Sequence, residues 1–193
     1  MPEIKTIAVI GAGRTGRGIA QIAALAGYRT ILEDILPASL RRAETEISGE
    51  INRAVELGRY SREQGDVAIR RLEFATSLED AAREAEMVIE TVPQEFDSKE
   101  EIFRLLDRIC RPDTVLASNT ISLPVTDIAA VTERPEKVVG MRFTDPVHEM
   151  KSIEVIRAAK TDEDSLQAAV TVGRRMGLET SVVHERALSA PHS

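Results

Sequence analysis

Apolar and polar positions follow two different periods along this chain, and the switch between them predicts strands separated by helices. Short runs that are almost wholly apolar indicate strands covered on both faces, at residues 4–10, 29–34, 86–92, 113–117 and 137–143. Apolar residues at helical spacing indicate helices at residues 14–26, 78–84, 97–110 and 124–131. This alternation predicts an α/β fold with a doubly wound, mostly parallel sheet.

Residues 37–72 interrupt the alternation after the second strand. Apolar residues recur at helical spacing from Leu40 to Val55, a break follows at Leu57 and Gly58, and Ser61 can cap a second helix. The pattern predicts a helical hairpin inserted between the second strand and the third, which we expect at 86–92. The hairpin is either a solvated excursion or an arm that contacts a ligand.

The remainder of the chain extends the sheet. Apolar residues predict two more strands, at 153–156 and 178–183, on either side of a helix at 162–176 that ends at Gly177. We expect both strands at the far edge of the sheet. Residues 1–186 then form one domain, and residues 187–193 form a loose tail.

Composition narrows the choice of partners. The net charge is −7 and 3% of the residues are aromatic, so a basic stripe and stacking platforms for a nucleic acid are both missing. No apolar stretch has the length of a membrane span, and no charged leader precedes the first strand, which predicts a cytoplasmic protein. No metal-ligand spacing occurs, and Cys110, the single cysteine, lies on the apolar face of a predicted helix, where we expect a packed thiol.

The end of the first strand carries the strongest chemical signal. Ile7–Ile10 leads directly into Gly-Ala-Gly-Arg-Thr-Gly, residues 11–16, and then into an alanine-rich helix. In this G-x-G-x-x-G arrangement Gly11 permits a tight turn, Gly13 lets the backbone approach a pyrophosphate, and Gly16 permits close packing of the helix. The helix N-terminus then directs its amide groups at phosphate. The motif and the alternating elements together predict a dinucleotide-binding sheet of the Rossmann type.

Acidic residues at the end of the second strand select the cofactor. Glu33 and Asp34 end the strand that we expect at 29–34. A carboxylate in this position can accept both hydroxyl groups of adenosine ribose, and it would repel a 2′-phosphate. We therefore expect NAD rather than NADP, with Asp34 on the ribose.

Five segments, taken in order, resemble the NAD-binding domain of the 3-hydroxyacyl-CoA dehydrogenases: GAGRTGRGIAQIAALAGY, VIETVPQEFDSKEEIF, LASNTISL, RPEKVVGMRF and DPVHEMKSIEVI. The resemblance runs from about Lys5 to Val183. It implies NAD as the cofactor, hydride transfer to or from a hydroxyacyl-CoA, and a hairpin that lies against coenzyme A. With the motif residues, it implies cofactor contacts from Gly11, Gly13, Arg14, Thr15, Gly16, Asp34, Lys99 and Asn119, the last two near the nicotinamide.

The chain departs from the family pattern where the chemistry is expected. The family has a histidine base in His-Phe-Phe-Asn-Pro, whereas this chain has Arg142-Phe-Thr-Asp-Pro. The family's partner glutamate aligns with Glu154, its substrate-binding serine with Ile121, and a glutamate after the third strand with Gln94. Family members continue into an all-helical second domain, which we expect to be absent because this sequence ends at Ser193.

Arginine stays charged at neutral pH, so Arg142 cannot be the base. Its guanidinium can hold an alkoxide, a carbonyl oxygen or a substrate carboxylate, or it can form a buried ion pair with Glu154. His148 is a candidate replacement base in the following loop, to which Asp145, aligned with the family's asparagine, adds negative charge. The candidate catalytic residues are Arg142, Glu154, Asn119 and His148.

Two functions are compatible with these features. One is an NAD-dependent oxidoreductase that transfers a hydride between NAD and a small-molecule substrate, a hydroxyacyl-CoA or a related hydroxy acid. The other is a catalytically silent NAD-binding subunit or sensor that needs a partner chain. In either case we expect the edge and top of the sheet, including the apolar segment from Ile121 to Val125, to be less covered than in a two-domain relative. This favours a homodimer or a partner complex.

Overall fold

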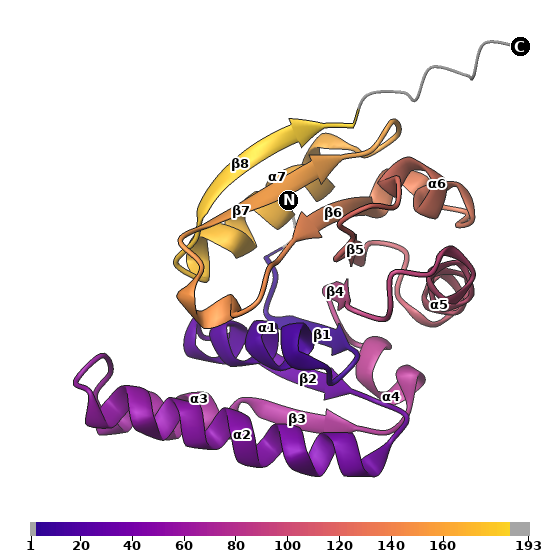
Figure 1. The fold of residues 1–193 in the computed structure, drawn as a ribbon. Coiled ribbons are helices and arrows are strands. Elements are labelled where there is room, and N and C mark those ends of the chain that lie inside the picture. The colour runs from indigo at the N-terminus through magenta and orange to yellow at the C-terminus, as the bar shows by residue number, and fades with distance from the viewer. Residues whose placement is uncertain (1–2, 186–193) are drawn as a thin grey trace, which may run out of the picture.

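The strands form a single sheet in the computed structural model, which describes residues 3–185; the tail expected at 187–193 lies outside them. Among the described residues the sheet has eight strands in the order β3-β2-β1-β4-β5-β6-β7-β8, from the bottom of Figure 1 to the top. The strands are β1 (Thr6–Ile10), β2 (Arg29–Glu33), β3 (Leu72–Ala75), β4 (Met87–Glu90), β5 (Val115–Ser118), β6 (Val138–Arg142), β7 (Ser152–Arg157) and β8 (Glu179–His184). The helices are α1 (Arg14–Leu25), α2 (Pro37–Glu56), α3 (Arg62–Arg70), α4 (Leu78–Ala82), α5 (Phe96–Ile109), α6 (Val125–Ala130) and α7 (Glu163–Arg175), with short 3-10 turns η1 (Pro135–Lys137) and η2 (Val147–Glu149).

All neighbouring strands run parallel except β6 and β7, so the prediction of a doubly wound, mostly parallel sheet is confirmed. The chain begins at β1 in the middle, moves outward through β2 and β3, and then returns to the other side of β1 with β4. Ligands of such sheets bind outside the carboxyl ends of the strands where the strand order reverses. In this sheet that place lies outside the carboxyl ends of β1 and β4, between the loops that follow them, and it is called the crevice below.

Helices cover both faces of the sheet, and this explains the uninterrupted apolar strands. Ile7 and Val9 of β1 pack toward α1, α2 and α7, whereas Ala8 and Ile10 pack toward α4, α5 and α6. All four side chains are at most 1% exposed. Because both faces are buried, successive residues of a central strand are all apolar, as in parallel sheets generally.

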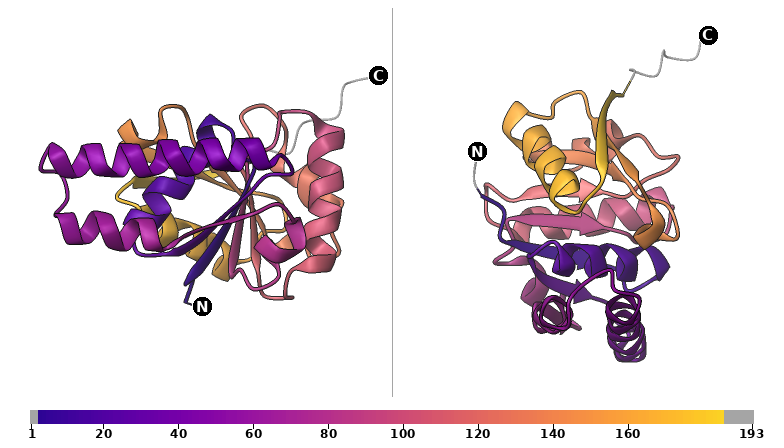
Figure 2. Two further views of the ribbon diagram at one scale, coloured as in Figure 1. Left: turned by 90° about the horizontal axis from the view of Figure 1, so that it is seen from below. Right: turned by 90° about the vertical axis from the view of Figure 1, so that its left-hand side faces the viewer.

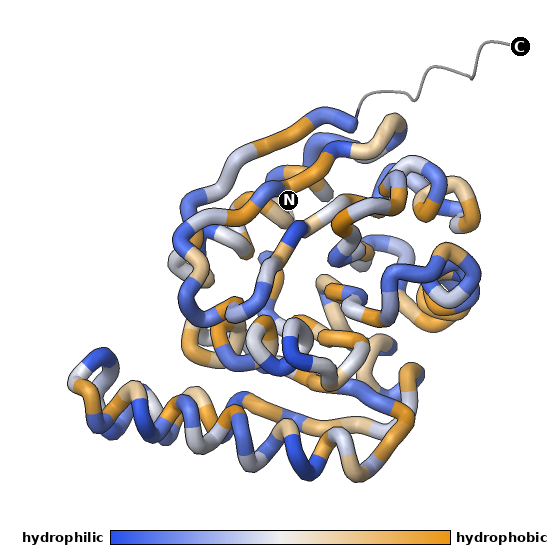
Figure 3. The backbone as a smooth tube through the Cα atoms, in the orientation of Figure 1, coloured by the Kyte–Doolittle hydropathy of each residue, from blue (hydrophilic) through white to orange (hydrophobic). Residues whose placement is uncertain are grey.

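The helical hairpin predicted after the second strand is present. Its two helices, α2 and α3, lie side by side beyond the β3 edge of the sheet (Figure 2). Gly58 has a φ of +71° in the turn, and Ser61 caps α3 in a capping box with Gln64. Figure 3 shows hydrophilic and hydrophobic positions alternating along α2, as expected for a helix with one buried face.

The expected position of the third strand is wrong. The hairpin helices end at Arg70, and Leu72–Ala75 forms β3, which pairs in parallel with β2 and places Leu72 opposite Thr30. The strand expected third, at 86–92, is the fourth. A strand of four residues with no fully buried position carries too little apolar pattern to be distinguished from the end of a helix.

Candidate dinucleotide-binding site

The three motif glycines lie in the loop between β1 and α1, and each has a different steric role. Gly11 has a φ of +101°, a conformation that side chains other than glycine rarely adopt. A Cβ atom on Gly16 would lie 1.8 Å from the carbonyl oxygen of Gly11, so Gly16 is required by the loop itself. A Cβ atom on Gly13 would meet nothing within 4 Å, which leaves the space above the loop open to a ligand.

Thr91, which follows β4, braces this loop and was not predicted from the sequence. Its hydroxyl lies 2.8 Å from the carbonyl oxygen of Ile10 and 3.1 Å from that of Gly11. The same hydroxyl lies 2.9 Å from the Cβ positions of Gly11 and Gly16, so all three residues pack closely at the crevice. A threonine directly after a buried strand is the only sequence signal for this role, and it is a weak one.

The first turn of α1 is suited to a pyrophosphate. Gly13 is its N-cap and provides no side-chain hydrogen bond, and the turn contains no acidic residue. The leading backbone N–H groups of a helix have no partner within it, and together with the helix dipole they attract an anion. The open space at Gly13 and these amide groups fit the diphosphate of a dinucleotide.

Asp34 lies directly after β2, beside the loop. Its carboxylate accepts hydrogen bonds from the backbone N–H of Ala12 and of Leu36, each at 2.9 Å. A carboxylate that is anchored by its backbone neighbours and half-exposed retains acceptor positions for ribose hydroxyls. Asp34 thus lies next to the glycine loop, where an adenosine ribose would need it.

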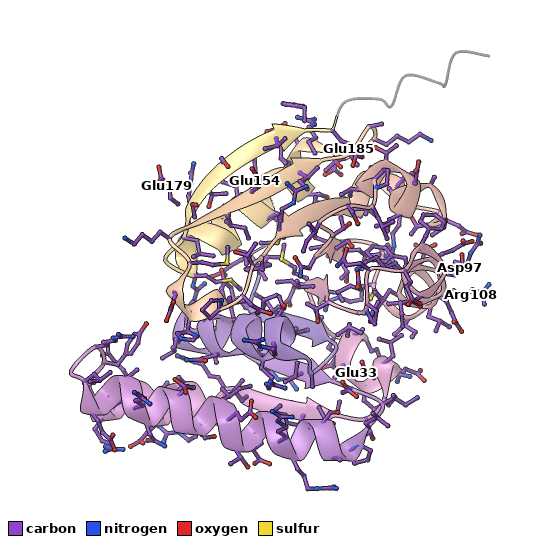
Figure 4. All side chains as sticks on the ribbon, viewed as in Figure 1. Glu33, Asp97, Arg108, Glu154, Glu179 and Glu185 are labelled. Carbon is purple, nitrogen blue, oxygen red and sulfur yellow. The ribbon has the colours of Figure 1, made fainter. Side chains whose placement is uncertain are left out.

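Glu33, by contrast, is buried at the end of β2, near α4 (Figure 4). Removal from water, which has the larger effect, and the neighbouring charge of Asp34 together raise the pKa of its carboxyl from 4.5 to about 7. The two adjacent acids therefore have opposite roles. Asp34 faces the crevice as an acceptor, and Glu33 is held in the protein interior.

Lys99 is enclosed beneath the site. Its Nζ lies 2.7 and 2.9 Å from the two carboxylate oxygens of Glu90, and both side chains are 0% exposed. The same carboxylate accepts hydrogen bonds from the hydroxyl of Ser118 at 2.7 Å and the N–H of Val92 at 2.6 Å. The resemblance implies a cofactor contact from Lys99, but its ammonium binds Glu90 and has no open surface toward the crevice.

Burial raises the pKa of the Glu90 carboxyl, and the ammonium of Lys99 opposes that effect. Sequence reasoning missed Glu90, because an acid inside an apolar strand is the only signal for it. Its partners come from α5 and from the neighbouring strand β5.

Asn119 connects two loops at the same edge of the sheet. Its side-chain oxygen accepts a hydrogen bond from the N–H of Phe143 at 2.9 Å, and its carbonyl oxygen accepts one from the side chain of Gln94 at 2.9 Å. Gln94 also accepts a hydrogen bond from the N–H of Ile121 at 3.1 Å. The segments after β4, β5 and β6 are therefore held together beside the crevice.

Arg142 and Glu154 are brought together by the antiparallel register of β6 and β7. Nη1 of Arg142 donates to Oε2 of Glu154 at 2.5 Å, and Nε donates to the carbonyl oxygen of Thr120 at 3.4 Å. The expected ion pair is present, but the expectation that it is buried is wrong, since the two side chains are 35% and 44% exposed. Figure 4 shows Glu154 on β7. The guanidinium keeps donors that face solvent.

The loop after β6 directs its polar groups at α1. The hydroxyl of Thr15 donates to both carboxylate oxygens of Asp145, at 3.2 and 3.1 Å. His148 lines a hollow of about 290 Å³ together with Arg14 and Arg17 of α1. Arg142 does not line this hollow, so the contacts of the described residues do not bring His148 to the Arg142–Glu154 pair.

Two further apolar positions were singled out from the sequence. The segment that begins at Ile121 is exposed at its start, where Ile121 is 60% exposed, and buried at its end, where Val125 opens α6. Cys110 is buried as expected, and burial raises the pKa of its thiol to about 11. Among the described residues, no helix is both long and apolar enough to span a membrane.

The parallel sheet, the glycine loop at the strand-order reversal and the adjoining Asp34 define a dinucleotide-binding domain of the Rossmann class. The family model for the 3-hydroxyacyl-CoA dehydrogenase NAD-binding domain matches residues 6–186. The chain belongs to this family, and NAD is the cofactor of the family domain.

Related proteins agree with this assignment. The chain is 42% identical to a protein of Bacillus subtilis (strain 168) described as "Probable 3-hydroxybutyryl-CoA dehydrogenase", over 91% of this chain and 61% of the relative. It is 36% identical to the 3-hydroxyadipyl-CoA dehydrogenase of Escherichia coli (strain K12), over 83% of this chain and 34% of the relative. The crystal structure of 3-hydroxybutyryl-CoA dehydrogenase from Escherichia coli K12 superposes with a TM-score of 0.92 at 32% identity, over 95% of this chain and 39% of that one. The chain thus spans 61% or less of the length of these relatives.

Proposed function

We propose that this chain binds NAD at the carboxyl ends of β1 and β4 and takes part in hydride transfer between NAD and a hydroxyacyl-CoA or a related hydroxy acid. The observation that carries the proposal is that three groups suited to such a reaction lie at the carboxyl ends of parallel strands, on one edge of the sheet. The glycine loop follows β1, Asn119 follows β5, and the partly exposed Arg142 ends β6. Relatives that act on 3-hydroxybutyryl-CoA and 3-hydroxyadipyl-CoA by name support the class of substrate.

Arg142 would hold the reacting oxygen of the substrate. Of the five N–H donors of a guanidinium, one engages Glu154 and one the carbonyl of Thr120, which fixes the plane of the group. The remaining donors can stabilise a developing alkoxide or a carbonyl oxygen. The carboxamide of Asn119 uses its oxygen for Phe143, so its NH2 group is available to a ligand. NAD, when bound, supplies the hydride acceptor.

Proton transfer requires a second group, because the guanidinium stays charged. His148 is our candidate, since imidazole is the side chain best suited to exchange protons at neutral pH. It lines the same hollow as Asp145, whose carboxylate contacts the first turn of α1. The substrate would need to reach this hollow for His148 to act.

NADH absorbance with a panel of 3-hydroxyacyl-CoA thioesters tests the proposal. Arg142→Lys should lose most of the turnover, because a point ammonium cannot reproduce the planar, two-pronged contact. Its affinity for NAD should be unchanged, and its free energy of unfolding should change by less than about 1 kcal/mol, since the ion pair is half-exposed. Turnover equal to that of the unchanged chain would contradict the role of Arg142.

A second candidate is a catalytically silent NAD-binding subunit or sensor. Two features favour it: Arg142 is already engaged in an ion pair, and Ile121 has an apolar side chain where the family pattern has a serine. NAD binding without turnover on any thioester of the panel, with or without a co-purified partner, would support it. Under this reading Arg142→His combined with Ile121→Ser could restore oxidation of a 3-hydroxyacyl-CoA.

We also propose that the chain works as a homodimer or in a complex with a partner chain. Ile35 and Ile121 have exposed apolar side chains at the carboxyl edge of the sheet. Exposed apolar side chains of this kind support an interface with another chain at this edge. Light scattering at tens of micromolar tests this proposal. A monomer, together with no partner recovered by pull-down, would contradict it.

A further inference from the structure

The carboxylate of Asp145 contacts the first turn of α1, which we expect to bind the pyrophosphate of the cofactor. Thr15 is the second residue of α1, in the turn whose amide groups have no partner within the helix. Its hydroxyl donates to both oxygens of the Asp145 carboxylate. An acid carried by the loop after β6 therefore lies against the anion-attracting end of α1.

Asp145 forms none of the ion pairs found among the described residues, although Arg14 and Arg17 line the same hollow. Arg17, which lines the same hollow, is bound to Glu46 at 3.0 Å and to the carbonyl oxygen of Ala12 at 3.0 Å. The hydroxyl of Thr15 is thus the contact that keeps Asp145 at the helix end.

We propose that Asp145 sets the affinity for the dinucleotide, because its carboxylate competes with the pyrophosphate for the first turn of α1. Binding then requires the carboxylate to leave Thr15, and the cost of that exchange lowers the affinity. The inference rests on the dinucleotide site described above. It adds a residue that the glycine motif and the ribose-binding acid do not include.

Asp145→Asn is the informative change, since it keeps the size of the side chain and an acceptor for Thr15 while it removes the charge. Coulomb's law for unit charges about 5 Å apart across solvent predicts an affinity that is roughly three- to tenfold higher in the variant. Salt screens such an interaction, so the difference between variant and unchanged chain should shrink as the salt concentration rises.

Isothermal titration calorimetry with NAD+, NADH and ADP-ribose tests the inference. ADP-ribose contains the pyrophosphate but no nicotinamide, so all three ligands should bind Asp145→Asn more tightly by a similar factor. Glu149→Gln is the matched control, because Glu149 is an acid of the same loop that is 70% exposed and faces His148. Its affinities should equal those of the unchanged chain. Asp145→Ser provides a second uncharged variant in case asparagine perturbs the loop.

Three results would overturn the inference. Equal affinities in Asp145→Asn and the unchanged chain would show that the carboxylate leaves the helix end without cost. Weaker binding of NAD+ alone would mean that Asp145 faces the positive nicotinamide ring, not the pyrophosphate. Failure of every variant and of the unchanged chain to bind any of the three ligands would overturn the dinucleotide site as well, which separates the two failures.

Discussion

The buried pair of Lys99 and Glu90 leads to a quantitative prediction about stability. Both side chains are 0% exposed, and Nζ of Lys99 reaches both carboxylate oxygens. Lys99→Met keeps most of the apolar length of the side chain but leaves Glu90 without its cation. Removing one partner of a buried pair costs about 3–5 kcal/mol. A loss of 1 kcal/mol lowers Tm by roughly 2–4 °C in a domain of this size, so we expect a fall of about 6–20 °C.

The loss should also depend on pH. Burial already raises the pKa of Glu90, and without Lys99 nothing of opposite charge opposes it. A carboxyl whose pKa is raised in the folded state stabilises the fold below its unfolded pKa and loses that contribution as the pH rises through the folded pKa. Urea unfolding, followed by circular dichroism, should therefore show a larger loss at about pH 8 than at about pH 5.

Two controls accompany this measurement. In Glu90→Gln combined with Lys99→Met, no charge remains buried, so the double variant should be more stable than Lys99→Met alone. Arg29→Ala removes one partner of the Arg29–Glu73 pair, whose side chains are 45% and 47% exposed, and should cost less than about 1 kcal/mol. A loss below about 1 kcal/mol in Lys99→Met, or a double variant that is no more stable, would refute the reasoning.

Four further predictions concern the crevice and the residues beside it. Glu33→Gln should stabilise the fold at about pH 8 and make the free energy of unfolding depend less on pH. The reason is that a carboxyl pKa raised from 4.5 to about 7 costs up to about 3 kcal/mol of stability as the pH rises through that range. Chemical unfolding at a series of pH values measures this. NAD should bind at least about tenfold more tightly than NADP, and Asp34→Asn should narrow that ratio in calorimetry; equal affinities in the unchanged chain would contradict the prediction. Gly13→Ala should weaken NAD binding with little change in stability, since the added Cβ atom meets only open space in the protein. Gly16→Ala should lower Tm, since a Cβ atom there would lie 1.8 Å from a carbonyl oxygen. Arg142→Ala should leave the free energy of unfolding within about 1 kcal/mol, and a loss near 3–5 kcal/mol would mean that the pair is structurally buried in solution.

Much of this site could be predicted because its signals are local. The turn at Gly11 and the cap at Ser61 depend on the conformations of neighbouring residues, which the chain specifies within a few positions. The acid at Asp34 is predictable for the same reason, since it follows its strand directly. The continuous apolar runs also identify strands that are buried on both faces, and thus a parallel sheet.

The tertiary structure alone decided which distant residues meet. Glu90, Lys99 and Ser118 come from β4, α5 and β5, and their contact depends on how the helix folds back over two neighbouring strands. The exposure of the Arg142–Glu154 pair was likewise not predictable, because an alternating pattern gives the register of two strands but not what covers them. The approach of Asp145 to Thr15 likewise depends on how the loop after β6 packs against α1. Local sequence determines the backbone conformation and the buried face of each element. Ion pairing, burial and pKa depend instead on the packing of segments that are far apart in the chain.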